Sequence, residues 1–123
     1  MEVTSMLSLK DNTQIYLCLQ PVDMRKSING LSVAVIDILN QQSTSGHVFI
    51  FYNKLKDKVK ILWWDTNGYI VCYKRLEKGR FKIPRDIENK SMSIEHKQLN
   101  WLLAGLDFDL MHQFSDLNYS DSY

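Results

Sequence analysis

Basic residues recur along the segment 73–85, and aromatic rings are interleaved with them. Its cations and rings are Lys74, Arg75, Lys78, Arg80, Lys82, Arg85, Tyr73 and Phe81. Lysine and arginine side chains supply contacts to phosphate, and a flat ring can stack on a nucleobase. The pattern is typical of a surface that binds nucleic acid, but a solvated charged face has the same composition. Chemistry alone leaves both interpretations open.

Two adjacent tryptophans precede this segment in KVKILWWDTNGY, residues 58–69. Side chains alternate between the two faces of a strand, so Trp63 shares a face with the apolar Ile61 and is assigned to the core. Trp64 shares the other face with Lys60. We therefore expect Trp64 to be the partly exposed ring and a candidate platform for a base.

The stretch DMRK forms a second basic spot. If Asp23 caps a helix, Arg25 and Lys26 fall in its first turn, where the helix dipole favours anions over cations. An anion held by the free backbone N–H groups and these two side chains would explain their presence. An ion pair with Asp23 or with a carboxylate of the sheet is the simpler alternative.

Other chemistries find little support. The histidines are scattered and Cys18 and Cys72 form no close pair, so no zinc-ligand spacing is present and free thiols are expected. Nucleophile motifs and phosphate-binding glycine patterns are also missing. Asp23, Asp65 and Glu77 could converge in a metal-dependent nuclease. A helix cap, a turn former and an ion-pair partner explain these three more simply, so we expect no enzyme activity, no metal and no cofactor.

The periodicity of apolar residues predicts the order β-α-β-β-β-α. Main strands are expected at 13–19, 47–53, 58–65 and 69–76, with a short edge strand at 79–84 that Pro84 ends. The strand 47–53 is apolar throughout and is expected at the centre of the sheet. Asn67 and Gly68 are expected in the hairpin turn because both of its central residues must accept positive φ.

Two helices complete the prediction. The first opens at Asp23 and buries an apolar face, with Gly30 marking either a later helix start or a close contact. The second is capped by Ser93 and ends near Gly105. The order favours an α+β fold: a small, mainly antiparallel sheet with a central basic hairpin, packed by two helices.

Length and charge bound the class of protein. With 123 residues the chain is expected to form a single domain over 1–108, followed by an acidic, flexible tail over 109–123. No secretory signal or membrane span is recognised, which favours a cytoplasmic protein. Residues 54–85 carry ten basic and three acidic residues, a net charge of +7, whereas the whole chain carries +1. The middle of the chain is thus the candidate for an anionic partner.

Longer motifs resemble a known family. PVDMRKSINGL, SGHVFIFYNKLKDKVKILWWDTNGY and YKRLEKGRFKIP are similar, in order and spacing, to the accessory protein encoded by the second open reading frame of the bacterial insertion-sequence sixty-six family. The resemblance covers about residues 7–108. Ser27 stands where this family usually has glycine in D-M-R-K-G, and QLNWLLAGLDF resembles its closing helix. The resemblance implies a role in transposition of a mobile element, beside a separate transposase that carries the strand-transfer chemistry, and it implies no catalytic residues.

We therefore predict a non-enzymatic, DNA-binding accessory factor for transposition of an insertion sequence. The residues expected to contact nucleic acid are Arg25, Lys26, Trp64, Lys74, Arg75, Lys78, Arg80 and Arg85. The transposase of the same element is the second expected partner, and no membrane is involved. The alternative is a protein-interaction module in which the same residues bind the transposase without touching DNA, since tryptophan and arginine also anchor protein interfaces.

Overall fold

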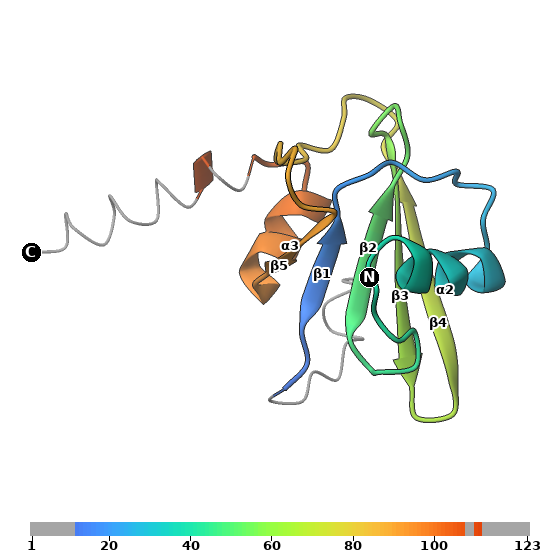
Figure 1. Ribbon diagram of the computed structural model, residues 1–123. Coiled ribbons are helices and arrows are strands. Elements are labelled where there is room, and N and C mark those ends of the chain that lie inside the picture. Colours follow the sequence, from blue (N-terminus) through green and yellow to red (C-terminus); the bar gives the residue numbers. More distant parts are fainter. Residues whose placement is uncertain (1–11, 108–109, 112–123) are drawn as a thin grey trace, which may run out of the picture.

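Five strands form one sheet in the order β4-β3-β2-β1-β5, and a helix packs on each of its faces (Figure 1). The computed structural model describes residues 12–107 and 110–111, so the tail expected at 109–123 lies outside the described residues apart from Leu110 and Met111. The elements are β1 (Ile15–Cys18), α2 (Ile28–Asp37), β2 (Val48–Tyr52), β3 (Lys58–Asp65), β4 (Gly68–Arg75), β5 (Ser91–Ile94) and α3 (His96–Leu103).

Strand pairing is mainly antiparallel. β1 and β2 pair in parallel through the α2 crossover, and the pairs β1–β5, β2–β3 and β3–β4 are antiparallel. The predicted α+β fold with two helices is therefore confirmed. The sequence did not reveal β5, and the basic hairpin β3–β4, which is central in the chain, lies at one edge of the sheet.

β2 is the middle strand, as predicted, and all five of its residues are buried. Phe49 and Phe51 pack in the core on the α2 side, and Ile50 packs in the core on the α3 side. A strand covered on both faces reads as a continuous apolar run, which is why its position was predictable. Trp63 is buried in the α3-side core, as expected from its strand face.

α2 begins later than predicted, at Ile28 with Ser27 in the cap position. Asp23 caps a tight turn and not the helix, because its carboxylate accepts a hydrogen bond from the backbone N–H of Arg25 at 2.8 Å. Arg25 and Lys26 therefore precede the helix. Gly30 lies inside it, and the expected close contact is present: a Cβ added there would stand 3.0 Å from Cβ of Lys26.

The turn of the β3–β4 hairpin also differs from the prediction. Asp65 pairs with Gly68, so the turn residues are Thr66 and Asn67, and Thr66 has a positive φ of 53°. The observed register places Ile61 opposite Cys72; a turn centred on Asn67 and Gly68 would have placed it opposite a lysine. Apolar cross-strand pairs thus outweigh the local preference of Asn-Gly.

α3 begins after β5, and Glu95 takes the cap position that was predicted for Ser93. At the other end Gly105, with φ of 78°, donates to the carbonyl of Leu102, and Leu106 donates to that of Trp101. This is the glycine-terminated helix end expected from the sequence. Among the residues described, no helix has the length and apolar character needed to cross a membrane.

Candidate nucleic-acid interface

Three connections leave the sheet at the same end. β1, β2 and β4 run in one direction and β3 and β5 in the other, so their registers bring the connections 19–27, 53–57 and 76–90 together at the top of Figure 1. The turn at Thr66 and Asn67 lies at the opposite end. The strand directions therefore gather segments that are far apart in the sequence.

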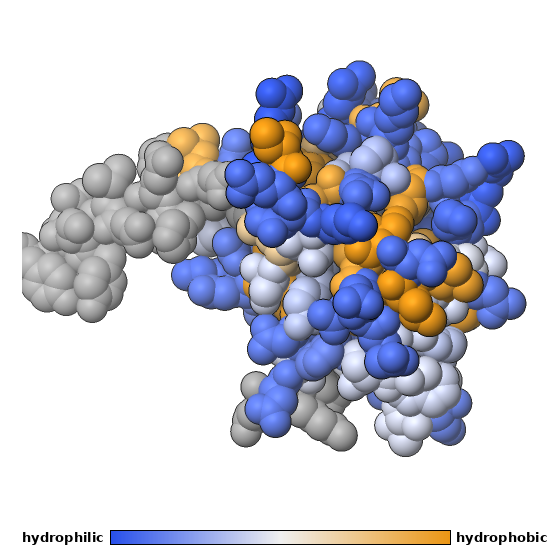
Figure 2. Space-filling view, in the orientation of Figure 1, coloured by the Kyte–Doolittle hydropathy of each residue, from blue (hydrophilic) through white to orange (hydrophobic). Residues whose placement is uncertain are grey.

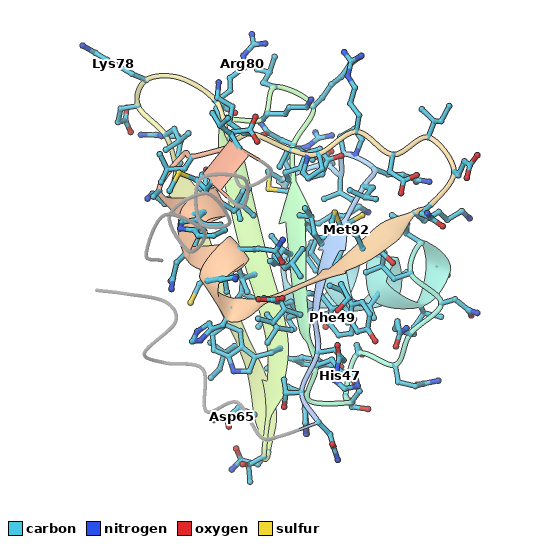
Figure 3. All side chains as sticks on the ribbon, turned by 90° about the vertical axis from the view of Figure 1, so that its left-hand side faces the viewer. His47, Phe49, Asp65, Lys78, Arg80 and Met92 are labelled. Carbon is cyan, nitrogen blue, oxygen red and sulfur yellow. The ribbon has the colours of Figure 1, made fainter. Side chains whose placement is uncertain are left out.

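These connections and the adjoining strand ends carry a cluster of cations. We refer to the cluster as the basic end; its eleven members are Arg25, Lys26, Lys54, Lys56, Lys58, Arg75, Lys78, Arg80, Lys82, Arg85 and Lys90. Figure 3 shows Lys78 and Arg80 at this end and Asp65 at the other. Sequence reasoning counted the lysines of 54–58 in the positive charge of residues 54–85 but treated the segment as a polar turn. It named none of them as a nucleic-acid contact, although their recurrence at every second position was a visible signal.

The segment 76–85 is anchored onto the β2–β3 turn. The predicted edge strand at 79–84 is wrong: Phe81 inserts its ring into the core, where it is 1% exposed, and its N–H donates to the carbonyl of Lys56 at 2.7 Å. Leu76 donates likewise to Asp57 at 2.8 Å. Phe81 is thus unavailable for stacking, but its burial positions the neighbouring Arg80 at the surface.

Three of the eleven cations are ion-paired with carboxylates. Asp57 pairs with Lys58, Glu77 with Arg75, and Asp23 with Arg25. The side chains of the other eight have no ion-pair or hydrogen-bond partner among residues 12–107 and 110–111: Lys26, Lys54, Lys56, Lys78, Arg80, Lys82, Arg85 and Lys90. Such an excess of uncompensated positive charge attracts polyanions.

Asp23 and Arg25 form the ion pair that was the simpler alternative for the DMRK stretch. The side-chain hydrogen bonds from Arg25, followed by its backbone N–H, lower the pKa of Asp23 from 3.8 to about 2. The guanidinium binds through Nε and Nη2, while Nη1 makes no contact within the described part of the chain, and the side chain is 92% exposed. Arg25 can therefore contact a second anion without leaving Asp23.

Two lysines of the hairpin donate hydrogen bonds to backbone carbonyls and so stabilise the fold. The ammonium of Lys60 donates to the carbonyls of Met24 at 2.8 Å and Lys26 at 2.7 Å. The ammonium of Lys74 donates to the carbonyl of Leu103 at 2.6 Å, although the sequence suggested Lys74 as a nucleic-acid contact. Both side chains join the sheet to a neighbouring segment.

Trp64 is not brought together with the basic end. It is half-buried and packs edge-on against Tyr69, with ring centroids 5.0 Å apart, beside the hairpin turn. Trp64 lies six positions along the strand from Lys58, a distance of about 20 Å at roughly 3.3 Å per residue. Tyr73 is the aromatic ring near the basic end, and it is 52% exposed.

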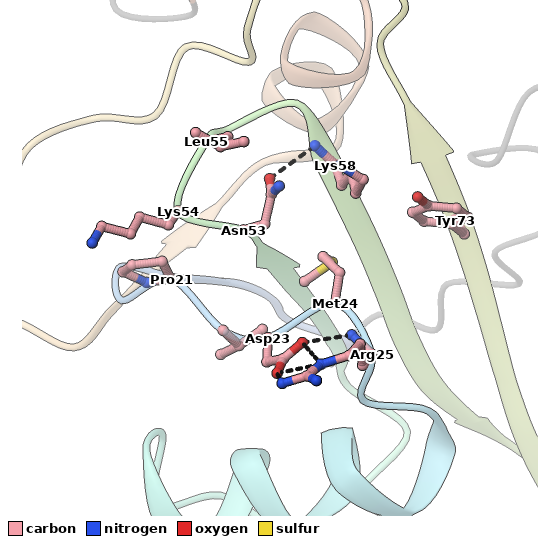
Figure 4. Close-up of a pocket in the computed structure, with 10 residues that line it drawn as sticks. Pro21, Asp23, Met24, Arg25, Asn53, Lys54, Leu55, Lys58 and Tyr73 are labelled. Carbon is pink, nitrogen blue, oxygen red and sulfur yellow. Dashed lines mark hydrogen bonds and ion pairs between the residues drawn. The ribbon is translucent and has the colours of Figure 1, made fainter.

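The basic end is hollowed by two pockets. One, with a volume of about 620 Å³, lies between the 21–25 segment, the β2–β3 turn and Tyr73 (Figure 4). The other, of about 340 Å³, is lined by Lys54, Lys56 and Arg85 among others. The structure therefore places loops from three parts of the chain around shared cavities.

The carboxylates considered for a nuclease site do not converge. Asp65 lies at the hairpin turn, whereas Asp23 and Glu77 lie near the other end of the sheet and pair with arginines. Within the part of the chain that the structure describes, no group of three or more His, Cys, Asp or Glu side chains can hold a metal ion. Cys18 and Cys72 are free thiols that pack in cores on opposite faces of the sheet.

The fold and the basic end together define a small α+β domain with a cationic surface built from loops. Comparison with known proteins gives the family: residues 13–113 match the IS66 Orf2-like proteins (TnpB_IS66), and the chain belongs to this family. Membership supports an accessory role in transposition of an insertion sequence and confirms the resemblance seen in the motifs.

Relatives from Sinorhizobium fredii have comparable length. The uncharacterized protein y4jC is 33% identical over 95 residues, which cover 77% of this chain and 80% of the relative. The uncharacterized protein y4hO is 30% identical over 103 residues, which cover 84% of this chain and 89% of the relative. No solved structure matches the chain.

Proposed function

We propose that the protein is a non-enzymatic accessory factor that binds DNA of its insertion sequence through the basic end. The observation that carries this proposal is the convergence of three connections, which gathers eleven cations at one end of the sheet. DNA phosphates would supply the negative charge that most of these cations do not receive from carboxylates of the protein. The family's role in transposition makes DNA the relevant polyanion.

The proposal is tested by the salt dependence of binding. Fluorescence anisotropy with a labelled duplex from the element end, and with an unrelated duplex, should give a dissociation constant that rises steeply with salt. Lys78→Ala combined with Arg80→Ala should reduce the slope of log affinity against log salt by about two, roughly one per lost phosphate contact. Preference for the element-end duplex would add sequence specificity.

A matched control is Lys97→Ala. Lys97 is a surface lysine in the first turn of α3, where it pairs with Glu95 at 3.5 Å. Its removal should leave the slope unchanged because it lies outside the basic end. Salt-independent binding, or equal effects of the control and the double variant, would contradict the proposal.

A second candidate function, contact with the transposase, is favoured by the outer surface of α2. Val33 and Ile36 are 53% and 50% exposed there, and Figure 2 shows apolar side chains gathered over this helix. We propose that this surface, not the basic end, binds the transposase. Co-purification of the two proteins should survive nuclease treatment and be lost on Val33→Ser with Ile36→Ser; persistence in that variant would contradict the proposal.

A further inference from the structure

The larger pocket of the basic end combines an apolar lining with cations at its rim. Its apolar contributions come from Pro21, Val22, Met24, Leu55 and Tyr73, and its cations are Arg25, Lys54 and Lys58 (Figure 4). A straight phosphate backbone needs cations but no apolar cavity. The combination instead matches a nucleotide, which joins a flat base that stacks through its faces to a charged phosphate.

We infer that this pocket holds one unpaired nucleotide of a bound DNA strand, with its base against Tyr73 and its phosphate at Arg25 and Lys54. The inference rests on the proposed function, because the rest of the DNA must lie along the basic end. A base inside a duplex presents only its edge to a protein, so a base that stacks on Tyr73 must be unpaired, either at a strand end or flipped out.

Exposure of the apolar lining supports a ligand that covers it. Leu55 is 60% exposed at the tip of the β2–β3 turn, and Tyr73 is 52% exposed on β4. The ammonium of Lys60 lies 5.5 Å from the centroid of the Tyr73 ring. A base placed on the ring would remove apolar surface from water, and stacking of this kind tolerates any of the four bases.

Charge at the rim suits one phosphate group. Lys54 has no ion-pair partner within the described residues, and Arg25 retains its Nη1 donors beside the pair with Asp23. Asp23 holds the Arg25 guanidinium through Nε and Nη2, and Figure 4 shows the two side chains together among the residues that line the pocket. The phosphate would thus meet two cations already at the rim.

The walls are held in place before any ligand arrives. Asn53 fixes the β2–β3 turn, because its Oδ1 accepts hydrogen bonds from the backbone N–H groups of Asp57 at 3.1 Å and Lys58 at 2.9 Å. On the opposite wall, Val22 donates to the carbonyl of Tyr52 at 2.9 Å, and Lys60 holds the carbonyl of Met24. A preformed cavity of about 620 Å³ falls within the usual range for small-ligand sites, roughly 300–1,000 Å³.

The test compares two DNA duplexes that differ only in one strand end. One is blunt, and the other carries three unpaired nucleotides that include the fluorescent base 2-aminopurine. We expect the full-length protein to bind the second duplex about tenfold more tightly and to quench its fluorescence, since stacking of one base is worth roughly a factor of ten in affinity. Tyr73→Ala should abolish this difference, and Tyr73→Phe should retain it.

Two further variants separate this inference from the proposed function. Leu55→Ala should reduce the overhang preference without changing affinity for the blunt duplex, whereas Lys78→Ala with Arg80→Ala should weaken both duplexes equally. Equal affinity for the two duplexes, with salt-sensitive binding intact, would overturn the pocket assignment alone. Absence of salt-sensitive binding to either duplex would overturn the proposed function as well.

Free nucleotide provides the last comparison. Deoxyadenosine monophosphate at millimolar concentration should remove the overhang preference and leave binding of the blunt duplex unaffected, because it competes only for the pocket. Binding of the free nucleotide as tightly as the overhang duplex would overturn a DNA strand end as the source of the ligand. One outcome would assign the pocket to protein recognition instead. In that case Tyr73→Ala would keep the overhang preference but would lose association with the transposase.

Discussion

The ammonium of Lys74, near the end of β4, donates a hydrogen bond to the carbonyl oxygen of Leu103, the last residue of α3, at 2.6 Å. The last carbonyls of a helix lack partners within the helix, and the dipole there favours a cation. A residue that the sequence suggested for DNA contact thus joins the sheet edge to a helix end.

Replacing Lys74 should therefore affect stability more than DNA binding. We expect Lys74→Ala to lower the free energy of unfolding by about 1 kcal/mol, the usual net contribution of a hydrogen bond at a helix end. Urea denaturation measures this change. Lys78→Ala is the matched variant and should weaken DNA binding at unchanged stability; the reverse pattern for the two lysines would contradict their assignments.

The glycines of the hairpin and of the basic end should respond differently to alanine. Gly79 has φ of 80°, so Gly79→Ala should reduce stability by about 1–2 kcal/mol through backbone strain alone. Gly68 is a strand residue outside the positive-φ region, with open space at its Cβ position. Gly68→Ala should stabilise the fold by up to about 1 kcal/mol, because the unfolded chain loses freedom.

Thermal denaturation of both glycine variants tests the hairpin register. A loss at Gly68 as large as that at Gly79 would show that the turn includes Gly68, as the sequence preference of Asn-Gly predicts. Thr66→Gly should add stability, because threonine is β-branched and its φ of 53° is strained.

The Asp23 and Arg25 pair predicts an acid-dependent contribution to stability. The pKa of Asp23 is about 2 in the folded chain against an ordinary 3.8, so the contribution is complete above about pH 4 and is lost as the pH falls toward 2. The carboxyl resonance of Asp23, followed by NMR, should titrate with a midpoint near 2. In Arg25→Ala the midpoint should return toward 3.8; an unchanged midpoint would show that Arg25 is not the cause.

Trp64 provides a test of which end of the molecule meets DNA. Its ring packs on Tyr69 beside the hairpin turn, away from the basic end. Trp64→Ala should lower the melting temperature because packing with Tyr69 is lost. Affinity for DNA should change by no more than about twofold, which is less than the loss of one charge-assisted hydrogen bond would cause. A tenfold loss of affinity in the folded variant would place the interface at the turn.

The local pattern of the sequence determined much of the fold. The five apolar residues of β2 predicted a central strand, alternation assigned Trp63 to the core, and Gly105 marked the end of α3. The long motifs also predicted the family. These properties depend on the residue itself and on neighbours a few positions away, which a sequence displays directly.

Only the tertiary structure decided which cations lie together. Whether Lys74 caps a helix, whether Phe81 enters the core and whether Lys54 and Arg25 line the same pocket all depend on strand order and register. The same holds for β5, which pairs with β1 from more than 70 positions away, as in Cys18 opposite Ser91. Strand order is set by burial of apolar surface over the whole domain, so charges on the connections are positioned by core residues far from them in sequence.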